Sequence, residues 1–165
     1  MSQQVFVAGV GMIPFAKPGA SEPYDAMGAA AAVDALADAG VAYPDVEQAY
    51  VGYVYGDSTA GQKALYRVGM TGIPVFNVNN NCSTGSTALF LARQAIASGA
   101  VDCALALGFE QMAPGALGTH FNDRPTPFDD FNRETDALAG MTDLPPAIRY
   151  FGGAGLAHLR QHGTT

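Results

Sequence analysis

Residues 77–89 read Asn-Val-Asn-Asn-Asn-Cys-Ser-Thr-Gly-Ser-Thr-Ala-Leu, and this stretch decides how the chain is expected to fold. A β-rich run from Ile73 to Val78 ends in a cluster of asparagines. Small and apolar residues follow at once over residues 82–98 and predict a helix that Gly99 closes. The junction is therefore a strand that turns directly into a helix, with Cys82 at the turn.

The same alternation of strand and helix extends on both sides of this junction. β-rich runs cover residues 5–10, 48–55 and 103–109, and helical patterns cover residues 24–39 and 60–68. The last of these runs is continuously apolar, which is typical of a strand buried on both faces. Short connections between alternating strands and helices indicate an α/β domain with a largely parallel sheet.

The regular pattern stops after Glu110. Five of the ten prolines lie between residues 111 and 150, mixed with Gly, Asp and Asn, and one short helix is expected at residues 151–162. A loop-rich stretch of this length is unusual inside a compact domain, and it is normally functional. The predicted organisation is an α/β domain over residues 1–110 and a loop-rich segment over residues 111–165.

Composition excludes several classes of protein. The chain has 165 residues, of which 48% are hydrophobic and 14% charged, so it is not disordered. Its net charge of −7 argues against nucleic acid or an anionic membrane as the partner, because both select for Lys and Arg. No apolar stretch reaches the roughly 18 residues of a membrane span. Two cysteines are too few for a disulfide scaffold and lack metal-ligand spacing, so we expect a cytoplasmic protein without a metal.

Cys82 is the strongest candidate for chemistry. Asn81 is well suited to cap the following helix, which would place Cys82 in its first turn. Unpaired backbone N–H groups and the helix dipole stabilise a thiolate there, and the same N–H groups could hold the oxyanion of an acyl intermediate. The alternative for any lone cysteine is an inert buried side chain. We interpret Cys103 in that second way, because it lies in an apolar strand.

Other residues are weaker candidates. Gly9 and Gly11 follow the first predicted strand, but Pro14 stands where a dinucleotide-binding fingerprint needs Gly or Ala at the start of a helix. The three histidines lie in the irregular part of the chain, with no partner at catalytic spacing, and they are His120, His158 and His162. The basic residues that could meet an anionic cofactor, each by default a surface charge, are Lys63, Arg67, Arg93, Arg124, Arg133 and Arg149.

At residues 79–89 the sequence closely resembles the thiolase superfamily, and specifically the sterol carrier protein-2 type of thiolase. That group includes bacterial proteins called lipid-transfer protein or acetyl-CoA acetyltransferase. The resemblance extends along most of the chain and is carried also by residues 10–12, 51–59, 69–74 and 105–110. It implies a thiolase-like first half, with a mixed, mostly parallel sheet and helices on both faces, followed by a loop-rich segment.

The resemblance also implies a function. Cys82 would be the nucleophile that takes the acyl group from a 3-ketoacyl-CoA, with coenzyme A as a substrate and no permanently bound cofactor. The family enzyme has two similar halves in five layers, α-β-α-β-α, and this chain covers most of the first. The segment after residue 110 would begin the loop domain that contacts coenzyme A and helps to form tetramers. The strand from Ile73 to Val78 would pair across the two-fold axis of a homodimer.

The chain also departs from the family. The Gly-His-Pro segment, the His-containing box that activates the nucleophile and the second Cys-x-Gly motif belong to the second half, and none occurs here. The last strand of the first half is absent as well. We therefore expect a truncated thiolase that is inactive alone. Two alternatives stay open, namely a steroid side-chain acyl-CoA aldolase that works with a small acyl-CoA-binding partner protein, and a non-catalytic subunit that binds coenzyme A or lipid.

Overall fold

The computed structural model describes residues 4–116, 118, 121–139 and 143–164. The chain forms two units, Met1–Ala116 and Leu117–Thr165. The first unit is built on a sheet in which β1 (Gln48–Gly52) lies between β2 (Val75–Val78) and β3 (Ala104–Gly108). Both pairings are parallel, with Tyr50 opposite Phe76 on one side and Ala106 on the other. The α/β class and the parallel sheet predicted from the sequence are confirmed.

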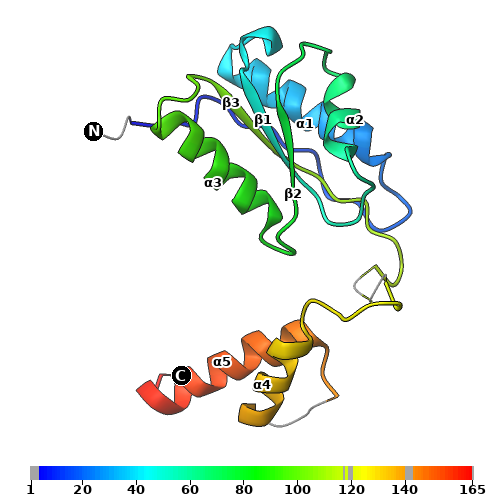
Figure 1. Ribbon diagram of the computed structural model, residues 1–165, viewed down its shortest axis with the longest axis vertical. Coiled ribbons are helices and arrows are strands. Elements are labelled where there is room, and N and C mark those ends of the chain that lie inside the picture. Colours follow the sequence, from blue (N-terminus) through cyan, green and yellow to red (C-terminus); the bar gives the residue numbers. More distant parts are fainter. Residues whose placement is uncertain (1–3, 117, 119–120, 140–142, 165) are drawn as a thin grey trace. The chain divides into compact units, whose positions relative to one another are not determined.

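Helices cover both faces of this sheet (Figure 1). α1 (Tyr24–Ala39) and α2 (Ala60–Tyr66) lie on one face, and a short 3-10 helix (Tyr43–Asp45) precedes β1. α3 (Thr84–Ala97) lies on the other face. Successive residues of a strand point to opposite faces, so the two cores alternate along the strands. Ala49, Val51, Leu105 and Leu107 pack toward α1 and α2, whereas Tyr50, Ala104 and Ala106 pack with Ala88 and Ala92 of α3.

The prediction of a strand at residues 5–10 is wrong. The segment packs on α1, where a side chain on Gly9 or Gly11 would collide with backbone oxygens of the helix. The N–H of Val10 donates to the Asp38 carboxylate at 2.9 Å. A groove of about 610 Å³ is lined by residues 5–11 on one side and by β3 on the other. No strand forms because a strand needs a hydrogen-bonded neighbour, and the groove separates this segment from β3.

The described residues of the second unit form two helices, α4 (Asp129–Ala139) and α5 (Pro146–His162). α4 is missing from the sequence prediction, and α5 begins at Pro146 instead of at residue 151. The predicted helix starts too late because the prolines before it are typical of a loop. Pro146 instead occupies the first turn of the helix, where its missing N–H costs nothing. Arg149 pairs with Asp136 at 2.6 Å and Tyr150 meets Phe131 edge to face, yet α5 has no buried residue.

Within the described part of the chain, no helix is both long and apolar enough to cross a membrane. The same residues include no group of three or more His, Cys, Asp or Glu side chains that could hold a metal ion.

We expect the open edge of β3 to be visible in amide hydrogen exchange. Phe109 donates its N–H to the Gly52 carbonyl, so the odd-numbered residues of β3 face β1 and the even-numbered residues face the groove. The N–H groups of Ala104 and Ala106 should therefore exchange at least about tenfold faster than those of Leu105 and Leu107. Residue-resolved exchange measured by NMR checks this, and equal protection at all four positions would contradict an open edge.

Candidate functional site

Cys82 lies in the turn that joins β2 to α3, and its side chain is exposed. The turn is held by hydrogen bonds among its own polar residues. The N–H of Asn80 donates to Thr84 Oγ1 at 2.8 Å, and the Thr84 hydroxyl donates to the Asn81 carbonyl. Thr84 is only 4% exposed, so the hydroxyl that binds both asparagines belongs to a buried residue. The asparagine cluster thus forms a rigid turn that presents Cys82 to solvent.

The predicted capping arrangement is wrong in detail. α3 begins at Thr84 with Ser83 in the capping position, so Cys82 precedes the helix and is not in its first turn. Asn81 is not the cap but has a positive φ of 49°, a conformation that Asn tolerates better than most residues. That reversal of the chain at Asn81 turns the backbone into the helix. Among the described residues, the N–H groups of Cys82, Gly85 and Ser86 have no hydrogen-bond partner.

The first turn of α3 packs directly against the end of β1 because the last residue of that strand is a glycine, Gly52. A Cβ on Gly52, the last residue of β1, would lie 2.7 Å from Thr84 Cγ2 and 2.9 Å from the Thr84 carbonyl oxygen. A Cβ on Gly108, at the end of β3, would lie 3.7 Å from the Cα of Gly85, whereas a Cβ on Gly85 would meet nothing within 4 Å. The absence of a side chain on Gly52 brings the Cys82 turn against the carboxyl ends of the strands, where parallel sheets bind ligands.

Two residues that follow the other strands lie in the same region. Tyr55 follows β1 and Glu110 follows β3. The pKa of the Tyr55 phenol is raised by burial, and further by the nearby charges of Glu110 and Cys82. Neither residue is predicted from the sequence to belong to the site. Their position directly after parallel strands was the available signal, because the carboxyl ends of parallel strands meet at one edge of a sheet.

Cys103 differs from Cys82 in environment. It precedes β3, is partly buried and packs against the main core. Burial raises the pKa of its thiol, and the negative charges of Glu47 and Asp45 raise it further. A thiol with a raised pKa carries little thiolate at neutral pH and reacts slowly. This agrees with the interpretation of Cys103 as a packing residue.

The other candidates make contacts within their own units. The rings of His158 and His162 contact each other within α5, tilted by 42° with 4.6 Å between centroids, and His120 lies outside the described residues. Most of the basic residues considered as contacts for an anionic cofactor pair with acidic side chains. Lys63 and Arg67 both contact the buried carboxylate of Asp25, which lowers the pKa of that acid. Arg124, Arg133 and Arg149 pair within the second unit, and Arg93 lines the groove beside β3.

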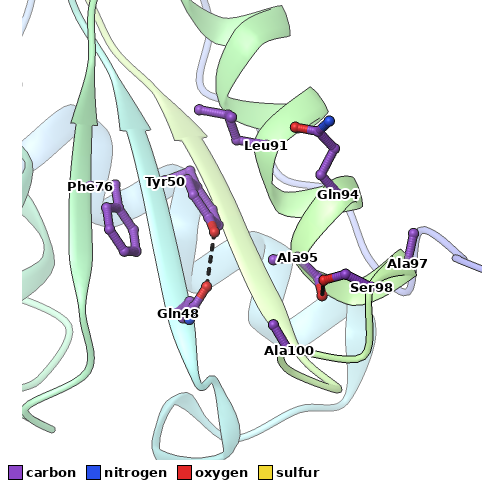
Figure 2. Close-up of a pocket in the computed structure, with 9 residues that line it drawn as sticks. All are labelled: Gln48, Tyr50, Phe76, Leu91, Gln94, Ala95, Ala97, Ser98 and Ala100. Atoms are coloured by element: carbon purple, nitrogen blue, oxygen red, sulfur yellow. Dashed lines mark hydrogen bonds between the residues drawn. The ribbon is translucent and has the colours of Figure 1, made fainter.

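A second hollow lies on the sheet face beside α3. Figure 2 shows Tyr50 and Phe76 side by side on the strands, with Gln94 and Ser98 of the last turns of α3 across from them. The two rings stack at 5.0 Å between centroids, and the Tyr50 hydroxyl donates to Gln48 Oε1 at 2.8 Å. Since Cys82 precedes the first turn of α3, the hollow is at the opposite end of the helix from the candidate site.

Sequence comparisons match this chain to known proteins along most of its length. The family model described as "Thiolase, N-terminal domain" matches residues 5–142. Sterol carrier protein 2 of Gallus gallus is 51% identical over 166 residues, which cover 99% of this chain and 30% of that protein. Sterol carrier protein 2 of Homo sapiens is 52% identical over 168 residues, with 98% and 30% coverage. The chain thus spans about a third of the length of these relatives.

A more distant relative is the benzoylsuccinyl-CoA thiolase subunit BbsB of Thauera aromatica, 35% identical over 133 residues that cover 76% of this chain and 34% of the subunit. Among solved structures, the Ltp2-ChsH2(DUF35) aldolase matches with a TM-score of 0.60 and 16% identity, over 96% of this chain and 38% of that one. At that identity the likeness shows the fold alone.

We expect Gly52→Ala to displace the Cys82 turn, whereas Gly85→Ala should leave it in place. A Cβ at position 52 collides with Thr84, and such overpacking costs about 1–3 kcal/mol. A Cβ at position 85 meets nothing within 4 Å, and alanine within a helix adds up to about 1 kcal/mol of stability. Urea unfolding measures both, with the alkylation rate of Cys82 as the readout of its position. Equal effects of the two variants would contradict the role of Gly52.

Proposed function

The chain belongs to the thiolase family, and from that premise we propose that Cys82 is the nucleophile of a thiolase-type acyl transfer that acts on 3-ketoacyl-CoA. The observation that carries the proposal is the exposed Cys82 thiol in a rigid turn beside unpaired N–H groups. A Cβ on Gly85 would meet nothing within 4 Å, so the first turn of α3 leaves open space for an acyl chain to approach. No other candidate nucleophile among the described residues has this combination.

The reaction would proceed in two steps. The Cys82 thiolate attacks the ketone carbon of the substrate, and the bond between that carbon and the α-carbon breaks. The α-carbon takes a proton and leaves as acetyl-CoA, while the acyl group stays on Cys82 as a thioester. The thiolate of a second coenzyme A then attacks the thioester, forms the shortened acyl-CoA and releases Cys82. Coenzyme A is therefore a substrate in this proposal, and the reverse direction condenses acetyl units.

The N–H groups at the start of α3 would act on the intermediates. Attack by Cys82 turns a carbonyl oxygen into an oxyanion, and unpaired donors directed at that position stabilise it. The N–H groups of Cys82, Gly85 and Ser86 are the donors available in the described residues. The positive end of the α3 dipole adds to this stabilisation because it lies at the same place.

The chain alone supplies only the nucleophile. Its 165 residues contain no Gly-His-Pro segment and no Cys-x-Gly motif. General acid and base groups typically contribute about 10²–10⁴-fold each to such a reaction. We therefore propose that the chain by itself is acylated but turns over poorly. The aldolase alternative has no observation of its own, since the likeness to the aldolase structure shows the fold alone.

The proposal is tested by chemical labelling at neutral pH. We expect limiting iodoacetamide to label Cys82 at least about tenfold faster than Cys103, because thiolate content governs the rate. With acetoacetyl-CoA, peptide mass spectrometry should find the acetyl adduct on Cys82, with one acetyl-CoA released for each adduct, while transfer of that acetyl group to a second coenzyme A stays slow.

The matched controls are Cys82→Ala, which should lose the adduct, and Cys103→Ala, which should keep it. Equal labelling of the two cysteines, or an adduct on Cys103, would contradict the assignment of the nucleophile. Rapid thiolysis by the unassisted chain would instead contradict the claim that other groups are needed.

The two open edges of the sheet suggest where further chain belongs. We propose that the groove between residues 5–11 and β3 is the seat of the last strand of the family's first half, because β3 lines the groove with an edge that has no strand neighbour among the described residues. We propose that the other edge, β2, pairs with β2 of a second copy. Phe76 supports this, since it is 46% exposed on the face beside α3, where a partner would cover it.

The dimer proposal predicts the effect of proline on each edge. Ala49 donates to the Pro74 carbonyl and Tyr53 to the Val78 carbonyl, so even-numbered residues of β2 face β1 and Val75 faces outward. Val75→Pro removes an outward donor without breaking the internal ladder, and it should convert the dimer to a monomer. Ala106→Pro, the equivalent change at the groove edge of β3, should leave the dimer intact. Sedimentation velocity measures both, and a monomeric parent chain would overturn the proposal.

A further inference from the structure

We propose that Glu110 is a positioning residue that fixes the segment carrying Tyr55 beside Cys82. Its Oε2 accepts the N–H of Val54 at 3.0 Å, and its Oε1 accepts the N–H of Tyr55 at 3.0 Å. One carboxylate thus binds two successive backbone N–H groups, each with a separate oxygen. The effect of this contact on activity rests on the proposed role of Cys82. The two hydrogen bonds themselves do not depend on that role.

The segment needs such an acceptor because it has left the sheet. β1 ends at Gly52, and the N–H of Tyr53 still donates to the Val78 carbonyl of β2. Beyond that residue the chain no longer has strand partners, and an unpaired N–H that is partly buried is costly. Hydrogen bonds to a carboxylate are stronger than those between neutral groups. Glu110 therefore accepts the backbone hydrogen bonds that a neighbouring strand would accept if β1 continued.

Glu110 is itself held firmly, so it can act as a reference point. The preceding Phe109 donates its N–H to the Gly52 carbonyl at 3.1 Å. The Phe109 ring stacks on Tyr53 and on Tyr24, in each case with 5.2 Å between centroids. The backbone of Glu110 thus continues directly from a strand and a three-ring stack. A movement of the Glu110 backbone relative to β1 would have to break these contacts.

Tyr55 connects this clamp to the candidate site. Glu110 and Cys82 both lie close enough to Tyr55 to act on the charge of its phenol. The segment is also fixed further along the chain, because the Tyr53 hydroxyl donates to the Asp57 carbonyl at 2.9 Å and accepts the N–H of Ala60. Hydrogen bonds thus hold the backbone of this segment at Val54, Tyr55 and Asp57. Glu110 is the contact that ties the segment to the end of β3.

The chain contains a matched control at the other end of the same strand pair. Glu47 precedes β1, and its Oε2 accepts the N–H groups of Asp102 and Cys103 just before β3. Both glutamates therefore join the flanks of β1 and β3 through two backbone donors. Glu47 lies at the amino end of the strands, away from Cys82. A loss of structure alone should affect the two variants alike, whereas a positioning role is confined to Glu110.

The test compares Glu110→Gln and Glu110→Ala with Glu47→Gln in the full chain. In 15N-resolved NMR spectra we expect the amides of Val54 and Tyr55 to follow the protonation of Glu110 in the parent chain and to lose that response in Glu110→Gln. Removal of the Glu110 charge should also lower the pKa of Tyr55, read from 13C-labelled tyrosine with Tyr55→Phe for assignment. Glu47→Gln should change neither signal.

The functional readout is the rate at which Cys82 is acylated. We expect Glu110→Ala to slow it by about tenfold or more, since small misplacements near a reacting group have effects of that size. Glu110→Gln keeps one acceptor and should recover part of the rate, and Glu47→Gln should match the parent chain. Equal rates for the Glu110 and Glu47 variants would overturn the positioning role, and unresponsive Val54 and Tyr55 amides would overturn the clamp. A parent chain that is never acylated would overturn the proposed function, while the NMR signals would still decide the clamp.

Discussion

The close contact between the start of α3 and the end of β1 is the constraint on which the rest of this unit depends. Thr84 lies against Gly52, and any side chain at position 52 would push the helix away from the sheet. Because the helix is close, Thr84 is buried and its hydroxyl can hold the turn that contains Asn80 and Asn81. The direction in which Cys82 points therefore follows from the absence of one Cβ on a neighbouring strand.

The same sheet has edges and surfaces that the described residues leave uncovered. Its three parallel strands leave one open edge at β2 and another at β3. Helices cover the two faces of the sheet unequally. α1 and α2 cover one face and build a core around Val51 and Leu65, whereas α3 alone covers the other. Large side chains such as Phe76, Leu89 and Phe90 remain exposed there. Exposed apolar surface of this kind marks an interaction site, which agrees with a chain that spans about a third of its relatives.

Several acidic side chains of this unit bind groups at the ends of its strands and helices. Glu47 and Glu110 each satisfy backbone donors where β1 or β3 lacks a strand partner, one at each end of the pair. Asp25 of α1 joins the two helices on one face of the sheet, because its Oδ2 lies 2.8 Å from Nε of Arg67 at the end of α2. An acidic chain thus uses several of its carboxylates internally. The net charge of −7 is consequently a poor guide to the surface that a ligand meets.

The sequence by itself determined the alternation of strands and helices in residues 24–108, because hydrophobic periodicity and glycine stops are local signals. It also marked Cys82, since the motif around it is short and distinctive. It failed at residues 5–10, which have the composition of a strand but lack a neighbour, and at α4, which flanking prolines concealed. Tertiary structure alone decided that Asn81 reverses the chain, that Gly52 admits Thr84, and that Tyr55 and Glu110 meet beside Cys82. These features join residues far apart in the chain, and such contacts are set by packing across the sheet, which no local pattern encodes.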